Sequence, residues 1–414
     1  MKRNNSKIRN IKARKILESR GKPTVEVELT TNLGKFLASV PSGASKGKYE
    51  AVALPLKQAI NNVNKIIAPK LKGKDVTQQI KIDELMRKLD GTKNKSKLGA
   101  NAILGVSLAA CRAGARANNL PLWKWISKIA GTKPLLPAPC ILFIEGGLHS
   151  KGDFDTRATV KGGEEASASL TFQEFMAYFP ARSFKEKFKT AGNVYKKLGQ
   201  VLKKRYGKGA TKLGMEGAFT PPIKKTKEVL DLLVETGGNK INIIIDAAAS
   251  TFFKKGKYSL EKKRLSEGEL LNFYLELCKN YPIVALEDPF SQEDWQGFQE
   301  ITKKIGKKVT IIGDDLLVTN LQRIKEAMKK KACNGLILKP NQVGTVTETI
   351  TAAKYATKKK WKVFVKHRGG ETKDDFIADL AIGLGTGFIM AGGPTKPERM
   401  AKYNRLLKVE EKLR

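Results

Sequence analysis

Hydrophobic positions near the start of the chain alternate with polar ones, at the period of a strand that has one buried face. This alternation predicts strands over 24–29 and 36–40, joined by a turn at 32–34 into an antiparallel hairpin. Apolar residues then recur every three or four positions over 56–67 and again over 99–118, as expected of helices. We therefore predict a small α+β domain over residues 1–133.

From about residue 134 the pattern changes to short apolar runs separated by helical stretches, which is typical of β/α units. Five successive runs end at ionisable residues: Asp246, Glu287, the pair Asp314 and Asp315, Lys339, and the pair Lys366 and His367. In a barrel of parallel strands these C-terminal ends meet at one mouth, where active sites are built. We therefore predict an α/β fold with a TIM-barrel-like β/α barrel over 134–414 and a site at its mouth.

Three of these strand ends carry the carboxylates that we single out, Asp246, Glu287 and Asp315. Like charges this close together cannot all remain ionised without a cation. Oxygen ligands favour Mg²⁺, whereas Zn²⁺ would normally recruit His or Cys. The alternative is that each carboxylate pairs with its own nearby lysine. The meeting of three strand ends at one mouth favours the metal site.

The next strand end carries Lys339. A divalent cation beside this side chain disfavours its ammonium form, so we expect its pKa to fall toward that of a general base. A lysine base beside a metal is suited to removing a proton α to a carboxylate, because the metal stabilises the charge that develops on the carboxylate oxygens.

Seven segments, in the same order along the chain, resemble segments of the enolase family. They are ESRGKPTVEV (18–27), VPSGAS (40–45), LGANAILGVS (98–107), LEDPF (286–290), GDDL (313–316), KPNQVGT (339–345) and HRGGET (367–372). The resemblance implies an enolase-type barrel that departs from the regular eightfold repeat in its first strands, capped by the N-terminal α+β domain. It implies interconversion of 2-phosphoglycerate, a phosphorylated hydroxy acid, and phosphoenolpyruvate, with Mg²⁺ held by Asp246, Glu287 and Asp315. We also expect a homodimer.

The resemblance also implies roles for individual side chains. Lys339 would take the C2 proton of 2-phosphoglycerate, Glu216 would help the C3 hydroxyl to leave, and Glu174 would support that acid. Substrate contacts are implied at four further positions: Ser45 on a loop that reaches a second metal, His149, His367, and Arg368 as the phosphate clamp.

Several positions depart from the family pattern. Met390 stands where the family has a lysine that holds the substrate carboxylate, and Gly369 replaces a phosphate-binding serine. Met215 replaces an aspartate, Glu145 replaces an asparagine, and the segment 150–171 is longer than the family's short lid. Loss of one preorganised electrostatic donor typically costs roughly 10²–10³ in rate. These departures put the activity in question and leave a catalytically impaired paralogue as the alternative.

The charge of the chain indicates what function a catalytically impaired paralogue would have. The 414 residues include 78 Lys and Arg against 40 Asp and Glu, a formal net charge of +38 that the chemistry does not require. Between residues 182 and 212, eleven Lys or Arg accompany one acid and an apolar stripe, which predicts a basic amphipathic helix. The surplus indicates either a solvated lysine-rich surface or a polyanionic partner, such as RNA, a ribonucleoprotein or an acidic filament such as a microtubule.

The apolar runs and the cysteines of the sequence indicate the cellular compartment. No apolar run approaches the ~20 residues of a membrane-spanning helix, and the basic start is not followed by the apolar part of a signal peptide. The four cysteines lie far apart, without the spacing of a zinc knuckle or a disulfide framework: Cys111, Cys140, Cys278 and Cys333. We expect reduced thiols, a cytoplasmic location and no membrane insertion.

Overall fold

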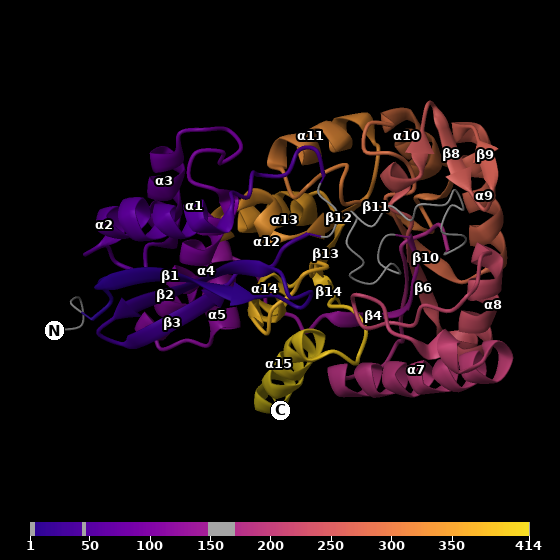
Figure 1. The fold of residues 1–414 in the computed structure, drawn as a ribbon, viewed down its shortest axis with the longest axis horizontal. Helices are drawn as coiled ribbons and strands as arrows, with labels where there is room; N and C mark the ends of the chain where they lie inside the picture. The colour runs from indigo at the N-terminus through magenta and orange to yellow at the C-terminus, as the bar shows by residue number, and fades with distance from the viewer. Residues whose placement is uncertain (1–4, 44–46, 148–169, 414) are drawn as a thin grey trace, which may run out of the picture.

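The chain folds into an N-terminal α+β part and a closed barrel, which lie side by side (Figure 1). The computed structural model describes residues 5–43, 47–147 and 170–413. Position 133, where we place the domain boundary, lies between the last helix of the first part, α5 (Leu122–Ala130), and the first strand of the barrel, β4 (Ala138–Glu145).

The N-terminal part is a three-stranded antiparallel sheet covered by helices. Its strands are β1 (Asn10–Leu17), β2 (Pro23–Thr31) and β3 (Gly34–Ser39). The hairpin of β2 and β3 was predicted, whereas β1 was not. Val25, Val27 and Leu29 alternate toward the core, where they face α4 (Ala100–Ala117). A Cβ on Gly105 of that helix would lie 2.6 Å from Val27 Cγ2, so only glycine permits this close approach.

Several short helices complete this part. The long helix predicted over 99–118 is confirmed as α4, and it is almost entirely buried. The helix predicted over 56–67 is instead divided into α1 (Leu56–Asn61), a π-helical turn (Asn62–Ile67) and α2 (Ala68–Leu71). The remaining helix is α3 (Gln79–Asp90).

The second part is an eight-stranded closed barrel, which confirms the predicted fold. The strands follow one another around the barrel in the order β10 (Ile283–Glu287), β11 (Thr310–Gly313), β12 (Gly335–Leu338), β13 (Lys362–Lys366), β14 (Gly387–Met390), β4, β5 (Glu174–Tyr178) and β6 (Asn242–Asp246). Strand β5 is antiparallel to both of its neighbours, and the other neighbouring pairs are parallel. The first strands therefore depart from the regular repeat, as the resemblance implied.

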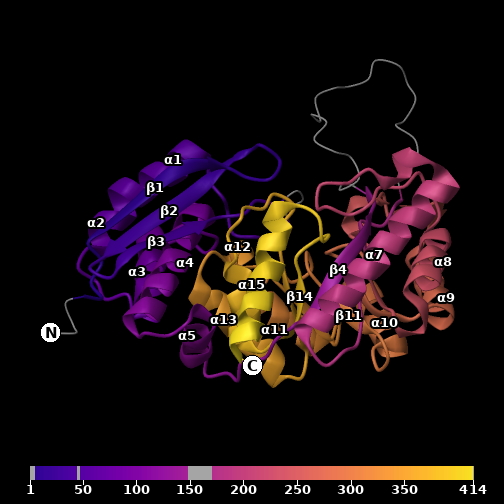
Figure 2. The same cartoon turned by 90° about the horizontal axis from the view of Figure 1, so that it is seen from below.

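Helices surround the barrel, and a small sheet of three short strands accompanies them (Figures 1 and 2). The strands of this sheet are β7 (Phe253–Lys254), β8 (Lys257–Leu260) and β9 (Lys263–Leu265). The helices are α7 (Phe184–Tyr206), α8 (Thr226–Gly237), α9 (Glu267–Asn280), α10 (Trp295–Ile305), α11 (Leu321–Lys330), α12 (Pro340–Val343), α13 (Val346–Lys358), α14 (Phe376–Leu384) and α15 (Pro397–Leu413). None of the helices in the described ranges combines the length and the apolar character needed to cross a bilayer.

Helix α7 is the predicted basic amphipathic helix. It begins with a capping box, in which Ser183 Oγ accepts from the Glu186 amide at 3.1 Å and Glu186 accepts from the Ser183 amide at 3.2 Å. The rings of Phe188 on α7 and Tyr403 on α15 lie 4.9 Å apart between centroids, which packs the two helices together. The opposite face of α7 is exposed and basic.

The N-terminal part meets the barrel beside its mouth. Ser42 and Gly370 exchange two backbone hydrogen bonds of 2.8 and 2.9 Å, which join the segment after β3 to the segment after β13. Arg112 of α4 binds Asp374, just before α14, with a shortest distance of 2.8 Å. The mouth is therefore built from both parts of the chain.

Candidate active site

Carboxylates of four neighbouring strands lie at one level of the barrel. Because β5 runs against its neighbours, its first residue, Glu174, is in register with the last residues of β4 and β6, Glu145 and Asp246. Asp246 is in turn in register with Glu287 of β10. All four side chains are buried. Glu174, which only the resemblance indicated, thus joins the two carboxylates that the strand pattern predicted.

One lysine binds three of these carboxylates. Lys366 Nζ lies 3.0 Å from Glu174 Oε2, 2.8 Å from Asp246 Oδ2 and 2.7 Å from Glu287 Oε1. Lys366 ends β13, which is separated from β6 by three strands in either direction around the barrel, so its side chain reaches across the mouth. The carboxylates therefore converge on a shared cation, and do not each pair with a separate lysine.

Burial dominates the protonation of this cluster. Loss of hydration raises the pKa of Glu174 and of Glu287 well above the usual range, because it disfavours the charged form, and the Lys366 ammonium opposes this rise. Burial alone would lower the pKa of Lys366, but the three carboxylates raise it well above its usual value. The lysine is thus fully charged at neutral pH.

The backbone after β11 presents the aspartate pair of the GDDL segment. Asp288 accepts hydrogen bonds from the amides of Asp314 at 2.9 Å and Asp315 at 2.7 Å, which fixes this turn. Asp314 is buried, and its carboxylate contacts Lys339 Nζ and accepts from Gln342 at 2.8 Å. Burial opposes ionisation, yet Lys339 lowers the pKa of Asp314 to about 2.

The two aspartates differ in their relation to the carboxylate cluster. The charge of Asp314 acts on both Glu287 and Lys366. Asp315 is half-buried, and burial together with the charge of Asp314 raises its pKa to about 7. The structure therefore buries Asp314 and leaves Asp315, the predicted ligand, half-buried, while the ligand atoms of Asp288, Asp314 and Asp315 lie within 4.8 Å of one another.

Lys339 is buried at the end of β12, as predicted. Burial would lower the pKa of its ammonium, but the Asp314 carboxylate more than offsets this and raises the pKa above the usual value. The expected fall in pKa concerned a site that contains a divalent cation and stays a prediction.

Glu216 contacts His367, the residue that follows Lys366 at the end of β13. His367 Nε2 lies 3.0 Å from Glu216 Oε2, and His367 Nδ1 contacts the Arg399 guanidinium. Burial lowers the pKa of His367 to about 4, so the ring is neutral at pH 7. Because arginine only donates, Nδ1 accepts and Nε2 carries the proton that is donated to Glu216.

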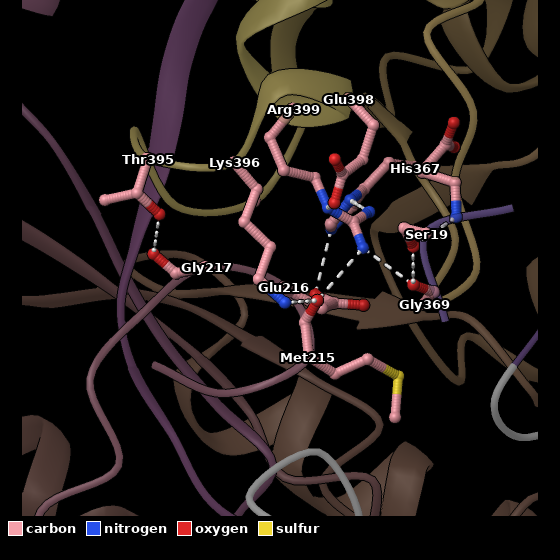
Figure 3. A network of polar contacts seen from close by, with 12 residues as sticks. Ser19, Met215, Glu216, Gly217, His367, Gly369, Thr395, Lys396, Glu398 and Arg399 are labelled. Carbon is pink, nitrogen blue, oxygen red and sulfur yellow. Dashed lines mark hydrogen bonds and ion pairs between the residues drawn. The ribbon is translucent and has the colours of Figure 1, made fainter. Parts of the chain in front are cut away.

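Helix α15 and Lys396, the residue just before it, hold both segments that carry these groups (Figure 3). Arg399 donates to the carbonyls of Arg368 and Gly369, both at 2.6 Å, and Lys396 donates to the Met215 carbonyl at 3.1 Å. Gly369 and Met215, two departures from the family pattern, thus contribute their backbones to this network.

The segment around Glu216 is also held by a second glutamate. Glu145 accepts from the Glu216 amide at 3.0 Å and from the Ala218 amide at 2.8 Å. Burial and the charge of Glu216 raise the pKa of Glu145 to about 8. Glu145 positions the segment through two backbone amides and adds a titratable group next to the predicted acid.

Arg368 lies where the two parts of the chain meet. Its guanidinium pairs with both carboxylate oxygens of Glu50, each at 3.1 Å, and donates to Asn341 at 3.2 Å. The predicted phosphate clamp is therefore held ready by a carboxylate from the N-terminal part.

The remaining departure, Met390, is fully buried. It packs inside the barrel with Cys140, Phe364 and other apolar side chains. Met390 is in register with Lys366 on the neighbouring strand. The side chain at the end of β14 therefore supplies no charge to the mouth, and the side chain beside it does.

The donor set fits a hard divalent cation. Asp246, Glu287, Asp314 and Asp315 offer carboxylate oxygens alone, the ligands that Mg²⁺ prefers. Glu287 Oε2 is buried and has no hydrogen-bond partner among the described residues, so one strong acceptor stands ready for a cation. Ser45, His149 and most of the segment 150–171 lie outside the described residues.

Sequence patterns missed two residues of this site. Lys366 was recognised only as the end of a strand, and no pattern shows which opposite wall a long side chain reaches. Arg399 lies on a helix rich in exposed charges, and nothing in the spacing marks it as buried.

Comparison with known proteins decides the family. Residues 8–126 match the enolase N-terminal domain, and residues 155–414 match the enolase C-terminal TIM barrel domain. The chain belongs to the enolase family. It is 47% identical to enolase of Mastigamoeba balamuthi over 99% of this chain and 96% of the relative, and 47% identical to enolase B of Dictyostelium discoideum over 98% and 95%. Enolase of Solanum lycopersicum is also 47% identical, over 98% of this chain and 95% of the relative.

Proposed function

We propose that the chain is a Mg²⁺-dependent lyase that interconverts 2-phosphoglycerate and phosphoenolpyruvate, and that the mouth of the barrel is its active site. Near-full-length identity to enolases supports this reaction. The observation that carries the proposal is the convergence of Lys339, Glu216 and the carboxylate cluster on one buried mouth.

In this proposal Asp246 and Glu287 hold the metal with a third ligand from the aspartate pair. We infer that this ligand is Asp314 in place of Asp315, because Asp314 is buried and its charge acts on Glu287. Mg²⁺ bound there would supply positive charge for the substrate carboxylate. His149 and Ser45 remain proposed substrate contacts, and Arg368 remains the proposed phosphate clamp.

The proton transfers are proposed to use side chains on opposite sides of the mouth. Lys339 takes the proton from C2, and the electrons of that C–H bond are first delocalised into the substrate carboxylate. In a second step these electrons form the C2–C3 double bond as the C3–O bond breaks. Glu216 gives a proton to the departing hydroxyl, which leaves as water. Glu174 and the neutral His367, which donates to Glu216, keep that acid in place.

Isotope exchange tests these roles separately. Lys339→Ala should abolish exchange of the C2 proton of 2-phosphoglycerate with solvent deuterium, because it removes the base. Glu216→Gln should suppress dehydration and retain exchange. Exchange that persists in Lys339→Ala would assign the base to another group.

The basic face of α7 favours a second, separate property. Lys185, Lys189, Lys196, Lys197, Lys203, Lys204 and Arg205 are exposed on this one helix. We propose that this face associates with a polyanion such as RNA, a ribonucleoprotein or an acidic filament, through charge and without sequence readout. The property would coexist with catalysis, because α7 lies on the outside of the barrel (Figure 2).

A homodimer and a cytoplasmic location also stay proposals. The free thiols of Cys111, Cys140, Cys278 and Cys333 support a reducing compartment. Light scattering in solution tests the dimer, and microscopy of the tagged protein in its own cell tests the location.

A further inference from the structure

Lys366 is a buried cation placed at the centre of the carboxylate cluster. Only 3% of the residue is exposed, and its ammonium is bound by carboxylates from β5, β6 and β10. An ammonium group has three N–H donors, and three carboxylate oxygens lie within 3.0 Å of Nζ. Two of these contacts, to Asp246 and Glu287, are hydrogen bonds and the third, to Glu174, is an ion pair, which describes a built site and not a passing surface contact.

Met390 on the neighbouring strand shows that the positive charge at this level of the barrel does not come from β14, where the family pattern has a lysine. Lys366 and Met390 are in register on adjacent parallel strands, so their side chains point to the same side of the sheet, into the barrel. Met390 packs among apolar side chains, whereas Lys366 extends to the opposite wall. The cation of this layer thus comes from β13.

The ammonium and the proposed metal would bind the same two carboxylates. Asp246 Oδ2 and Glu287 Oε1 lie 2.8 and 2.7 Å from Nζ, so the ammonium stands between the two carboxylates that would bind a divalent ion. Glu287 Oε2 has no hydrogen-bond partner among the described residues, so a divalent ion would bind the same carboxylate group beside the ammonium. Two cations on one pair of buried carboxylates repel strongly, so we expect the ammonium to move away when the ion binds.

We propose that Lys366 is a tethered competitor of the divalent cation: it holds Glu174, Asp246 and Glu287 together in the metal-free protein and must be displaced when the metal binds. The inference rests on the proposed ligand set of Asp246 and Glu287. Lys366 is a positioning residue in this account, and it sets the metal affinity and the stability of the metal-free site.

Magnesium titration of the full chain tests the competition directly. Calorimetry should show that Lys366→Met binds Mg²⁺ at least about tenfold more tightly than the unmodified protein, since no internal cation has to be displaced. In EDTA the same variant should melt several degrees lower, because three buried carboxylates lose their counterion, and saturating Mg²⁺ should restore the melting temperature. Lys362→Met, which removes an exposed lysine from the same strand, should behave as the unmodified protein in both measurements.

A second variant covers the case in which Lys366→Met does not fold. Lys366→Met with Glu174→Gln removes one negative charge and keeps both proposed ligands, so the double variant should fold and still bind Mg²⁺ more tightly than Glu174→Gln alone. Equal affinity with and without Lys366 would overturn the competition and leave the metal site standing. Absence of any Mg²⁺ response in every variant would overturn the ligand set itself, and the competition with it.

Discussion

At the scale of single residues, the two aspartates that follow β11 show how neighbouring identical side chains acquire different roles. Asp314 contacts Lys339 and is buried, whereas Asp315 is half-buried and its pKa is raised to about 7. The strand pattern marks both as residues of the mouth, but it cannot tell which one is buried beside Lys339. Which aspartate is buried depends on the turn that Asp288 fixes, because its carboxylate accepts hydrogen bonds from the amides of Asp314 and Asp315.

We therefore predict different metal dependence for the two aspartate variants. Asp314→Asn should weaken Mg²⁺ binding by at least about tenfold, roughly 1.4 kcal/mol, because it removes the proposed third ligand. Asp315→Asn should change the affinity by less than about threefold. Thermal shift against Mg²⁺ concentration measures both, and the reverse ranking would return the ligand role to Asp315.

At the scale of elements, the strand ends were the most predictable part of the site and the helices the least. Asp246, Glu287 and Lys339 follow apolar runs that are unmistakable in the sequence, and parallel strands bring such ends together. Glu174 was predicted only from the family resemblance. It begins an antiparallel strand, so the hydrophobic pattern of the sequence does not place it at the mouth of the barrel. Arg399 could not be predicted at all, since its burial results from the docking of α15 against two loops.

Helix α15 should be essential for the geometry of the mouth. Arg399→Met leaves the buried carbonyls of Arg368 and Gly369 without their donor, so we expect a loss of about 3 kcal/mol in the free energy of unfolding. Lys408→Met, an exposed change on the same helix, should stay within about 0.5 kcal/mol of the unmodified protein. Urea denaturation distinguishes the two, and equal effects would contradict the role of Arg399.

The contact between α4 and the segment before α14 should make stability depend on acid pH. Burial raises the pKa of Asp374, but Arg112 outweighs it and keeps the pKa below the ordinary value. A depressed carboxyl pKa stabilises the fold above the unfolded value, about 3.9, and this stabilisation is lost as pH falls through the folded value. Asp374→Asn should therefore cost about 3 kcal/mol at pH 7 and progressively less below pH 4.

Denaturation at several pH values measures this cost, and Asp375→Asn provides the control. The neighbouring Asp375 also pairs with Arg112, at 3.1 Å, but its side chain is 40% exposed. Asp375→Asn should thus cost less than about 1 kcal/mol at any pH. A cost for Asp374→Asn that does not change between pH 7 and pH 3 would show that its ionisation does not matter.

At the scale of the whole molecule, the net charge of +38 and the proposed active site involve different side chains. The carboxylates and lysines of the mouth are buried and paired, whereas the lysines of α7 are exposed on the outer face. The amphipathic pattern predicted this division correctly, since Phe184, Tyr195, Leu198 and Leu202 are buried. A pattern of charge cannot, however, identify which anion binds.

Salt dependence tests the proposed polyanion association. Replacing Lys196, Lys197, Lys203 and Lys204 by glutamine should weaken binding to RNA or to microtubules and flatten its decline with salt, because fewer counterions are released. The matched set Lys303, Lys304, Lys307 and Lys308 on and after α10 removes the same charge elsewhere and should have a smaller effect. Equal effects of the two sets would assign the binding to net charge alone. Absence of binding at low salt would contradict the proposed association and indicate that the lysines of α7 only form a solvated surface.

The central claim is that the mouth of this barrel is a working, metal-dependent active site despite Met390 and Gly369. The most direct measurement is the rate of phosphoenolpyruvate formation from 2-phosphoglycerate, followed by absorbance, with Mg²⁺ and again with EDTA. We predict turnover with Mg²⁺, none with EDTA, and a loss of at least about 10³-fold in Lys339→Ala. A folded protein that forms no phosphoenolpyruvate at saturating substrate and Mg²⁺ would contradict the claim and favour a catalytically impaired paralogue.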